Sequence, residues 1–157
     1  MSDNNAHLKS CNGGEISDDL PPLPYLKTVL VSAVILLDAD NRILLTQRPE
    51  GKSMPGLWEF PGGKVEENET PEFTLIRELN EELGIITGVD CLQPVTFASH
   101  SYDDFHLLMP VFACRTWKGI PHGRESQNLK WVYKNDLKNY PMPPADIPLI
   151  PLIHQLI

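Results

Sequence analysis

The chain has 157 residues, 41% of them hydrophobic and 22% charged, which fits one globular domain with a hydrophobic core. Thirteen Lys and Arg against twenty-one Asp and Glu give a formal net charge of −8. This charge argues against stable nucleic-acid binding or a membrane-surface role, because both partners attract basic surfaces. Three cysteines, Cys11, Cys91 and Cys114, match neither a disulfide framework nor a zinc-site spacing, so we expect a reducing, cytoplasmic location. No segment has the pattern of a signal peptide or a membrane span.

The chain begins with a segment that differs in composition from the rest. Residues 1–24 are rich in Ser, Asp, Asn, Gly and Pro, and such a composition buries too little apolar surface to order the chain. We therefore expect a flexible tail over 1–24 and a single domain over 25–157. In the domain, residues 28–37 and 42–48 are β-branched and aliphatic and flank a four-residue turn, which predicts a hairpin. Residues 49–63 contain several Gly and Pro and predict an irregular loop.

A helix is predicted over residues 71–83. Thr70 is a suitable N-cap, Pro71 suits the first helical position and Gly84 suits the C-terminal end. Within it Leu75, Leu79 and Leu83 recur every four residues and predict a core-facing stripe.

The second half of the chain predicts further strands. They cover residues 91–102, 105–117 and 128–134, with a Gly/Pro loop over 118–127 between the last two. A helical turn is expected at 136–139 and a closing helix that begins near Asp146. Strands with interspersed helices indicate a mixed α and β fold.

The opposite face of the predicted helix is acidic. Glu78, Glu81 and Glu82 stand at i, i+3 and i+4, so their carboxylates project together, and like charges at this spacing cost about 0.2–0.5 kcal/mol per pair. One interpretation is a solvated acidic face. The other is a metal site, because Gly62 and Gly63 just upstream allow the backbone to approach a ligand, and clustered carboxylates suit Mg²⁺ shared with substrate phosphates.

The acidic helix belongs to a longer pattern that resembles the Nudix box. Residues 62–85, GGKVEENETPEFTLIRELNEELGI, match the box at every fixed position, from Gly63 through Glu69 and the Arg77-Glu78-Leu79 triplet to the end at Gly84-Ile85. The preceding hairpin that ends in QRP, the segment GLWEFPGGKVE and the later PPADIPLI resemble the MutT-like branch of this family. The resemblance covers about residues 27–157.

The resemblance implies an α/β/α sandwich with a mixed central sheet, in which the box forms a loop–helix–loop that holds divalent metal against a nucleotide. It implies a hydrolase that cleaves a phosphoanhydride bond, with Mg²⁺, or Mn²⁺ as a substitute, neutralising charge on the phosphate oxygens. Arg77 and Glu69 would fix the carboxylates, and Glu78 would also orient or deprotonate water. The implied metal ligands are Gly62 (through its carbonyl), Glu78, Glu81, Glu82 and Glu125, although Glu125 is also interpretable as a solvated loop residue.

The implied substrate site draws on residues outside the helix. Arg48 would lie near the nucleotide, unless it is a surface arginine. Tyr102 and Phe105 would contact the base, although aromatic residues beside a strand often belong to the core. The remaining implied substrate-binding residues are Glu59, Phe60, Gly63, Lys64 and Asp146.

Asp146 bears on the choice of base. MutT-like proteins that select 8-oxo-dGTP have Asn after the PPA motif, whose amide donates to O6 and accepts from N7–H. An ionised aspartate accepts but does not donate, and the PPADIPL string also resembles the CTP pyrophosphohydrolase branch, where an acceptor suits the amine of cytosine. Asp146 is alternatively a cap of the closing helix.

The function expected is therefore a MutT-like triphosphate pyrophosphohydrolase that releases nucleoside monophosphate and pyrophosphate. 8-oxo-dGTP is the first candidate substrate, which would make the protein a sanitiser of the nucleotide pool for DNA replication and repair, and (d)CTP or a modified pyrimidine nucleotide is the second. A hydrolase of ADP-ribose, dinucleoside polyphosphates or capped RNA would carry the same box, and so would a non-catalytic nucleotide-sensing Nudix domain.

Overall fold

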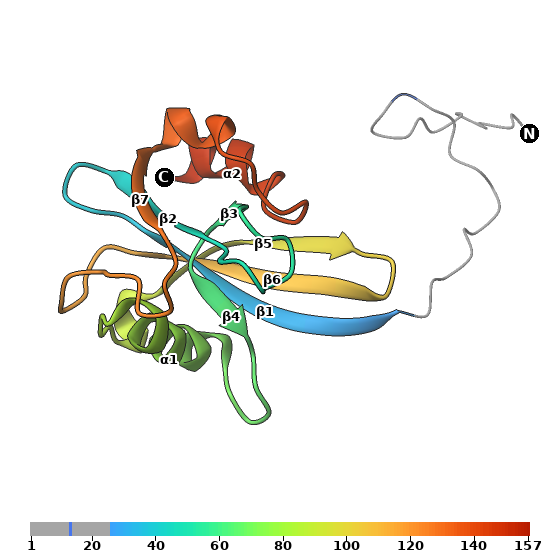
Figure 1. The fold of residues 1–157 in the computed structure, drawn as a ribbon, viewed down its shortest axis with the longest axis horizontal. Coiled ribbons are helices and arrows are strands. Elements are labelled where there is room, and N and C mark those ends of the chain that lie inside the picture. Colours follow the sequence, from blue (N-terminus) through green and yellow to red (C-terminus); the bar gives the residue numbers. More distant parts are fainter. Residues whose placement is uncertain (1–12, 14–25) are drawn as a thin grey trace, which may run out of the picture.

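The computed structural model describes Gly13 and residues 26–157, which form strands interrupted by two α-helices and two short 3₁₀ helices (Figure 1). The expected tail at 1–24 lies outside the described residues except for Gly13, and the domain boundary at residue 25 stays a prediction. No helix in the described part of the chain is long and apolar enough to cross a membrane. In chain order the elements are β1 (Lys27–Leu36), β2 (Arg42–Gln47), β3 (Trp58–Glu59), β4 (Gly62–Lys64), α1 (Pro71–Leu83), η1 (Val89–Cys91), β5 (Gln93–Ser101), β6 (Phe105–Cys114), β7 (Leu129–Tyr133), η2 (Lys134–Asn139) and α2 (Leu149–Leu156).

The strands form two sheets. The four-stranded sheet has the order β4-β1-β6-β5, in which β1 and β6 run parallel and the outer strands run antiparallel to their neighbours. The three-stranded sheet has the order β3-β2-β7 and is antiparallel throughout. The predicted mixed sheet is confirmed, and the separate three-stranded sheet is an addition to the prediction.

Helices cover the sheets from two sides, as Figure 1 shows for α1 and α2. The buried face of α1 packs its predicted leucine stripe on Val34 of β1 and Phe112 of β6. On the other side, Leu149 and Ile153 of α2 belong to a second core with residues of both sheets. These two apolar layers give the predicted α/β/α arrangement.

The ends of α1 agree with the sequence prediction. The Thr70 side chain accepts a hydrogen bond from the Phe73 backbone N–H at 3.3 Å, and Pro71 occupies the first turn. Gly84 ends the helix in the left-handed conformation, with a φ of 67°. Because both ends of the helix are fixed, the face on which Glu78, Glu81 and Glu82 project is fixed as well.

The predicted hairpin of β1 and β2 is wrong. The chain does turn at residues 38–41, but the two strands belong to different sheets and share the single bridge between Leu37 and Ile43. The physical reason is that β1 is paired on both edges, with β4 and with β6.

Two other predictions need correction. Part of the predicted loop at 49–63 is ordered as β3 and β4, because the glycines of β4 allow close pairing with β1. The closing helix begins at Leu149 rather than near Asp146. Asp146 does not cap the helix with its side chain, since the N-terminal position is taken by Pro148 and no side-chain hydrogen bond is made there.

Candidate active site

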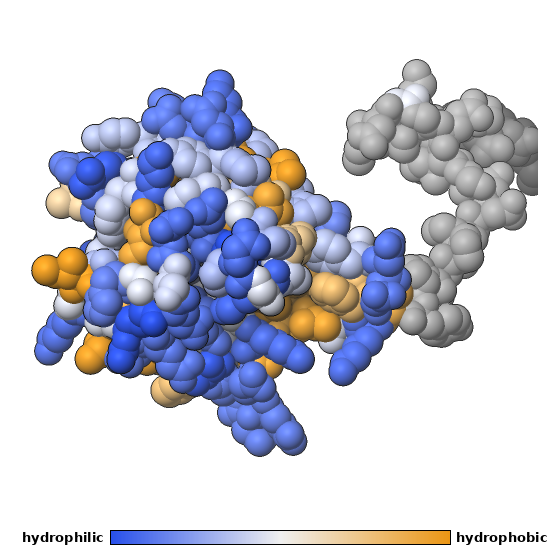
Figure 2. All heavy atoms as spheres, viewed as in Figure 1, coloured by the Kyte–Doolittle hydropathy of each residue, from blue (hydrophilic) through white to orange (hydrophobic). Residues whose placement is uncertain are grey.

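A cavity of about 560 Å³ lies where β1, β4, the exposed side of α1 and the loops before β3 and α2 meet. Glu78, Glu81 and Glu82 line it from α1, because the leucines of that helix are turned into the core. Figure 2 shows that hydrophilic residues dominate the surface over α1 and the loop that precedes it. One helix therefore serves both as a core element and as an acidic wall.

Arg77 holds two of these carboxylates from behind. Its Nη1 lies 2.6 Å from Glu78 Oε1 and 3.4 Å from Glu81 Oε2. Its Nε and Nη2 donate to the two oxygens of Glu69 at 2.6 and 2.9 Å. The Arg77 hydrogen bonds, with help from the Thr74 hydroxyl, hold the pKa of Glu69 at about 2. Neither Arg77 nor Glu69 lines the cavity, and both are placed to fix the side chains that do.

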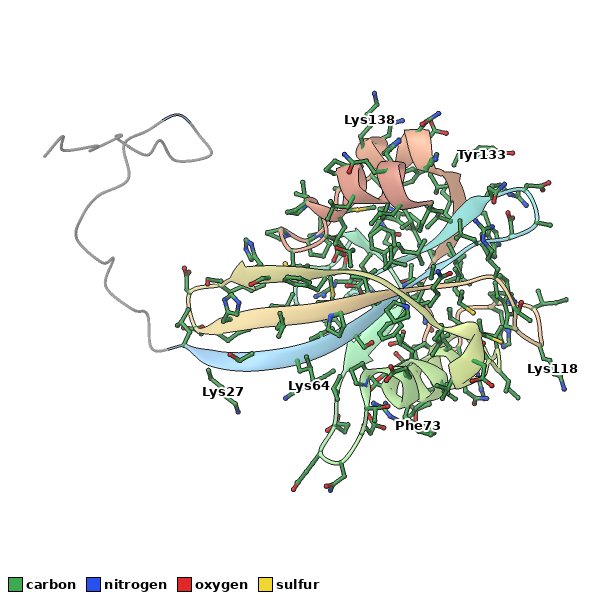
Figure 3. The ribbon with its side chains drawn as sticks, turned by 180° about the vertical axis from the view of Figure 1, so that it is seen from behind. Lys27, Lys64, Phe73, Lys118, Tyr133 and Lys138 are labelled. Atoms are coloured by element: carbon green, nitrogen blue, oxygen red, sulfur yellow. The ribbon has the colours of Figure 1, made fainter. Side chains whose placement is uncertain are left out.

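The glycines before the helix are required by close approach. Gly63 pairs with Ser32 of β1, and a Cβ atom on Gly63 would collide with the Glu78 carboxylate. A Cβ atom on Gly62 would collide with the backbone carbonyl of Ser32. Both glycines line the cavity, and Lys64 follows them at the end of β4 (Figure 3). The glycines therefore allow the β4 backbone to sit directly against the acidic helix.

Carboxyl groups of the cavity have raised pKa values where they lie close together. Burial, and then the charge of Glu78, raise the pKa of Glu82 to about 7, and the charges of Glu125 and Glu59 act in the same direction. Burial also raises the pKa of Glu78. Carboxylates that are poorly hydrated and repel one another are the donor set that a divalent cation stabilises.

The carboxylates of the cavity fit a metal ion with oxygen ligands, but several of them are paired with basic side chains in this structure. Within 26–157 no three His, Cys, Asp or Glu side chains converge closely enough to hold an ion as they stand. Arg77 occupies Glu78 and Glu81, and Lys52 occupies Glu125. Glu78, Glu81 and Glu125 therefore have to exchange these contacts before they can bind a metal ion.

Arg48 and Glu59 form an ion pair that lines the same cavity. Arg48 Nε lies 2.6 Å from Glu59 Oε2, and its Nη1 donates to Ser53. Burial raises the pKa of Glu59, although the Arg48 charge lowers it. Phe60 is buried and lines the cavity. Arg48 is therefore a partner within the site and not a free surface arginine.

The two predicted aromatic residues differ in their relation to the cavity. Tyr102 lines the cavity, and Phe105 stacks on Tyr102 with ring centroids 4.9 Å apart without lining the cavity itself. Phe105 thus supports the ring that faces the ligand space.

Asp146 reaches the cavity from the segment before α2. It is 5% exposed, and burial, and then the charge of Glu59, raise its pKa to about 7. Among the described residues no donor hydrogen-bonds its carboxylate, and the charge of Arg48, which acts in the opposite direction, offsets only part of the cost of burying the ionised form. The group is available to a ligand in the cavity.

Some residues of the cavity were missed by the sequence analysis. Lys52 and Ser53 lie in the loop predicted over residues 49–63, and no motif in that loop marks them as cavity residues. Leu107 and Met109 line the wall from β6, and Ser32 lies below β4. Their apolar or small side chains are indistinguishable in sequence from core residues.

Comparison with known proteins agrees with this site. The model of the NUDIX domain matches residues 32–152. The chain belongs to the Nudix family. This Nudix protein is 39% identical over 127 residues to a CTP pyrophosphohydrolase of Escherichia coli, covering 80% of this chain and 90% of the relative. It is 37% identical over 138 residues to an 8-oxo-dGTP diphosphatase of Haemophilus influenzae, covering 83% and 93% of the two chains.

Solved structures give the same assignment. A structure described as MutT, from work on Aliivibrio salmonicida and Vibrio cholerae, superposes with a TM-score of 0.69 at 37% identity and covers 83% of this chain and all of that one. The Nudix hydrolase described here therefore acts on phosphoanhydride bonds of nucleotides.

Proposed function

We propose that this Nudix hydrolase is a divalent-metal-dependent pyrophosphohydrolase that converts a nucleoside triphosphate to the monophosphate and pyrophosphate. The observation that carries the proposal is one cavity that is lined by the α1 carboxylates, by Glu59 and by the buried side chains of Phe60 and Asp146. A volume of about 560 Å³ is in the range of small-molecule sites. The nucleoside would lie against Phe60 and Asp146, and its phosphate chain would lie against the α1 carboxylates.

We propose Mg²⁺ as the cofactor, with Mn²⁺ as a substitute. Glu78, Glu81, Glu82, Glu125 and the Gly62 carbonyl would hold it, and when bound it would neutralise charge that develops on the phosphate oxygens. Glu78 would orient the attacking water and accept its proton, because burial already raises its pKa. Arg77 would keep Glu78 in place through the 2.6 Å contact.

The preferred base is 8-oxoguanine in this proposal. A neutral carboxyl group has one O–H donor and one carbonyl acceptor, the same pair that an asparagine amide offers. Protonated Asp146 would donate to O6 and accept from N7–H, and its pKa of about 7 makes this form accessible near neutral pH. An ionised aspartate could not donate to O6, but the raised pKa of buried Asp146 makes the protonated, donating form available. The protein would sanitise the cytoplasmic nucleotide pool.

The second candidate substrate is CTP or dCTP. It is favoured by the PPADIPL segment and by the 39% identity to a CTP pyrophosphohydrolase. An ionised Asp146 would accept a hydrogen bond from the exocyclic amine of cytosine. The two candidates thus differ in the protonation state that Asp146 must adopt.

A substrate panel with Mg²⁺ tests the proposal. We expect the highest kcat/KM for 8-oxo-dGTP, and we expect the ratio of the wild-type kcat/KM to that of Asp146→Asn to fall from pH 6 to pH 8.5, because Glu78 and Glu82 titrate in both proteins. Comparable kcat/KM for 8-oxo-dGTP and dGTP would exclude a sanitising role, and a preference for CTP or dCTP would favour the second candidate. Failure to release pyrophosphate or phosphate from any nucleotide with Mg²⁺ or Mn²⁺ would indicate a non-catalytic sensor.

A further inference from the structure

An ion pair outside the box closes one side of the cavity. Lys52 Nζ lies 3.0 Å from Glu125 Oε2, and the two side chains are 54% and 44% exposed. Lys52 comes from the loop between β2 and β3, and Glu125 comes from the loop before β7. Both residues line the cavity at the end where the α1 carboxylates lie.

The backbone around Lys52 is held in place independently of this pair. Arg48 Nη1 donates to the Ser53 carbonyl and hydroxyl at 2.9 and 3.0 Å. The Gly56 N–H donates to the Arg48 carbonyl, and the Gln47 side chain donates to the Gly56 carbonyl. The Lys52 side chain is therefore free to change partner without any rearrangement of its loop.

The backbone around Glu125 is tied to the end of α1. The Arg124 N–H and the Gln127 side-chain amide both donate to the Glu82 carbonyl, at 2.9 and 3.0 Å. The Arg124 side chain donates to the Asn80 carbonyl. Since these carbonyls belong to the last turn of the helix, Glu125 stays beside Glu82 whichever group its own carboxylate contacts.

Lys52 differs from the two arginines near the cavity in what holds it. Arg48 is engaged by Glu59 and Ser53, and Arg77 by Glu69 and Glu78. The side-chain partner of Lys52 is Glu125, which is one of the expected metal ligands. A metal ion that arrives with the nucleotide would compete with Lys52 for this carboxylate. A lysine ammonium is a point charge on a flexible stem and suits a phosphate oxygen.

We propose that Lys52 is a phosphate-binding residue that is paired with Glu125 until the nucleotide binds. This inference rests on the proposed triphosphate substrate. When the nucleotide binds with its metal, the Glu125 carboxylate turns to the metal and the Lys52 ammonium moves to an oxygen of the phosphate chain beyond the α-phosphate. The exchange keeps both charges paired before and after binding.

The inference is tested by binding measurements with a non-hydrolysable triphosphate analogue of 8-oxo-dGTP and with the corresponding monophosphate, both with Mg²⁺. We expect Lys52→Met to weaken the affinity for the triphosphate analogue about 10-fold to 100-fold and to leave the affinity for the monophosphate within about twofold. Lys52→Arg should recover most of the loss. Lys118→Met is the matched control, because Lys118 is exposed and lies beyond the opposite end of α1 from Lys64 (Figure 3).

A second readout does not require nucleotide. Mn²⁺ binding followed by electron paramagnetic resonance should become tighter in Lys52→Met, because Glu125 no longer has a competing partner, and Glu125→Gln should remove that gain. Equal triphosphate affinity in Lys52→Met and wild type, or an equal loss for monophosphate and triphosphate, would overturn the inference. A wild type that hydrolyses triphosphates while Lys52→Met matches it rejects this inference alone, and a wild type that binds no triphosphate rejects the proposed function as well.

Discussion

Replacing Asp146 by asparagine tests the electrostatics of the cavity through protein stability. An aspartate in the unfolded chain has a pKa near 3.8, whereas burial in the folded protein raises the pKa of Asp146 to about 7. The folded state thus binds this proton more tightly, and the stability from the neutral carboxyl is fully present below pH 3.8 and is lost as the pH rises to about 7. At about 1.4 kcal/mol per pH unit, the loss is about 4 kcal/mol.

Asparagine has nearly the same shape and does not ionise, so Asp146→Asn should avoid this loss. Urea unfolding of both proteins without metal, from pH 5 to pH 8, gives the difference in their free energies of unfolding. We expect this difference to move by a few kcal/mol in favour of the variant as the pH rises and to level off above pH 7. Asp90→Asn, an exposed substitution in η1, controls for the change in net charge. A difference that stays constant with pH would refute the raised pKa of the buried Asp146 carboxyl group.

The remaining predictions concern the helix and its neighbours. Glu78→Gln should lower kcat at least about 100-fold in the nucleotide assay, and near-wild-type turnover would contradict its role as ligand and base. Gly63→Ala places a Cβ against the Glu78 carboxylate and should weaken Mn²⁺ binding about 10-fold in titrations. Ser32→Ala should stabilise the fold by about 1 kcal/mol in thermal unfolding, because the Ser32 hydroxyl is buried with no partner among the described residues. Leu79→Ala should cost about 2–5 kcal/mol in urea unfolding, since Leu79 is almost fully buried.

The parts of the fold that the sequence predicts well are those that local signals determine. The helix bounds at Thr70 and Gly84 are set by a side-chain cap and a left-handed glycine, which act within a few residues. The hairpin prediction fails for the opposite reason. Which strand pairs with β1 depends on β4 and β6, and β4 consists of Gly62, Gly63 and Lys64, residues with no strand signal of their own.

The site shows the same division between local and distant signals. The box fixes the helix carboxylates and Arg77 by spacing, and the structure places them at one cavity or directly behind it. Lys52 had no such marker. Its position follows from hydrogen bonds between Arg48 and Ser53 and from the docking of a distant loop on α1. Contacts of this kind depend on the assembled fold and are invisible in a local pattern.

The acidity of the chain has a local origin that bears on substrate binding. The cavity is lined by six acidic side chains and by the three cations Arg48, Lys52 and Lys64, so it is negative when all are ionised. A triphosphate is itself strongly anionic, and the three cations, two of them already paired with carboxylates, do not offset the repulsion. Binding of the proposed triphosphate would therefore depend on divalent cations that both partners share. The acidic residues that argue against polyanion binding over the whole surface would thus, at this one cavity, favour binding of a small polyanion together with its metal.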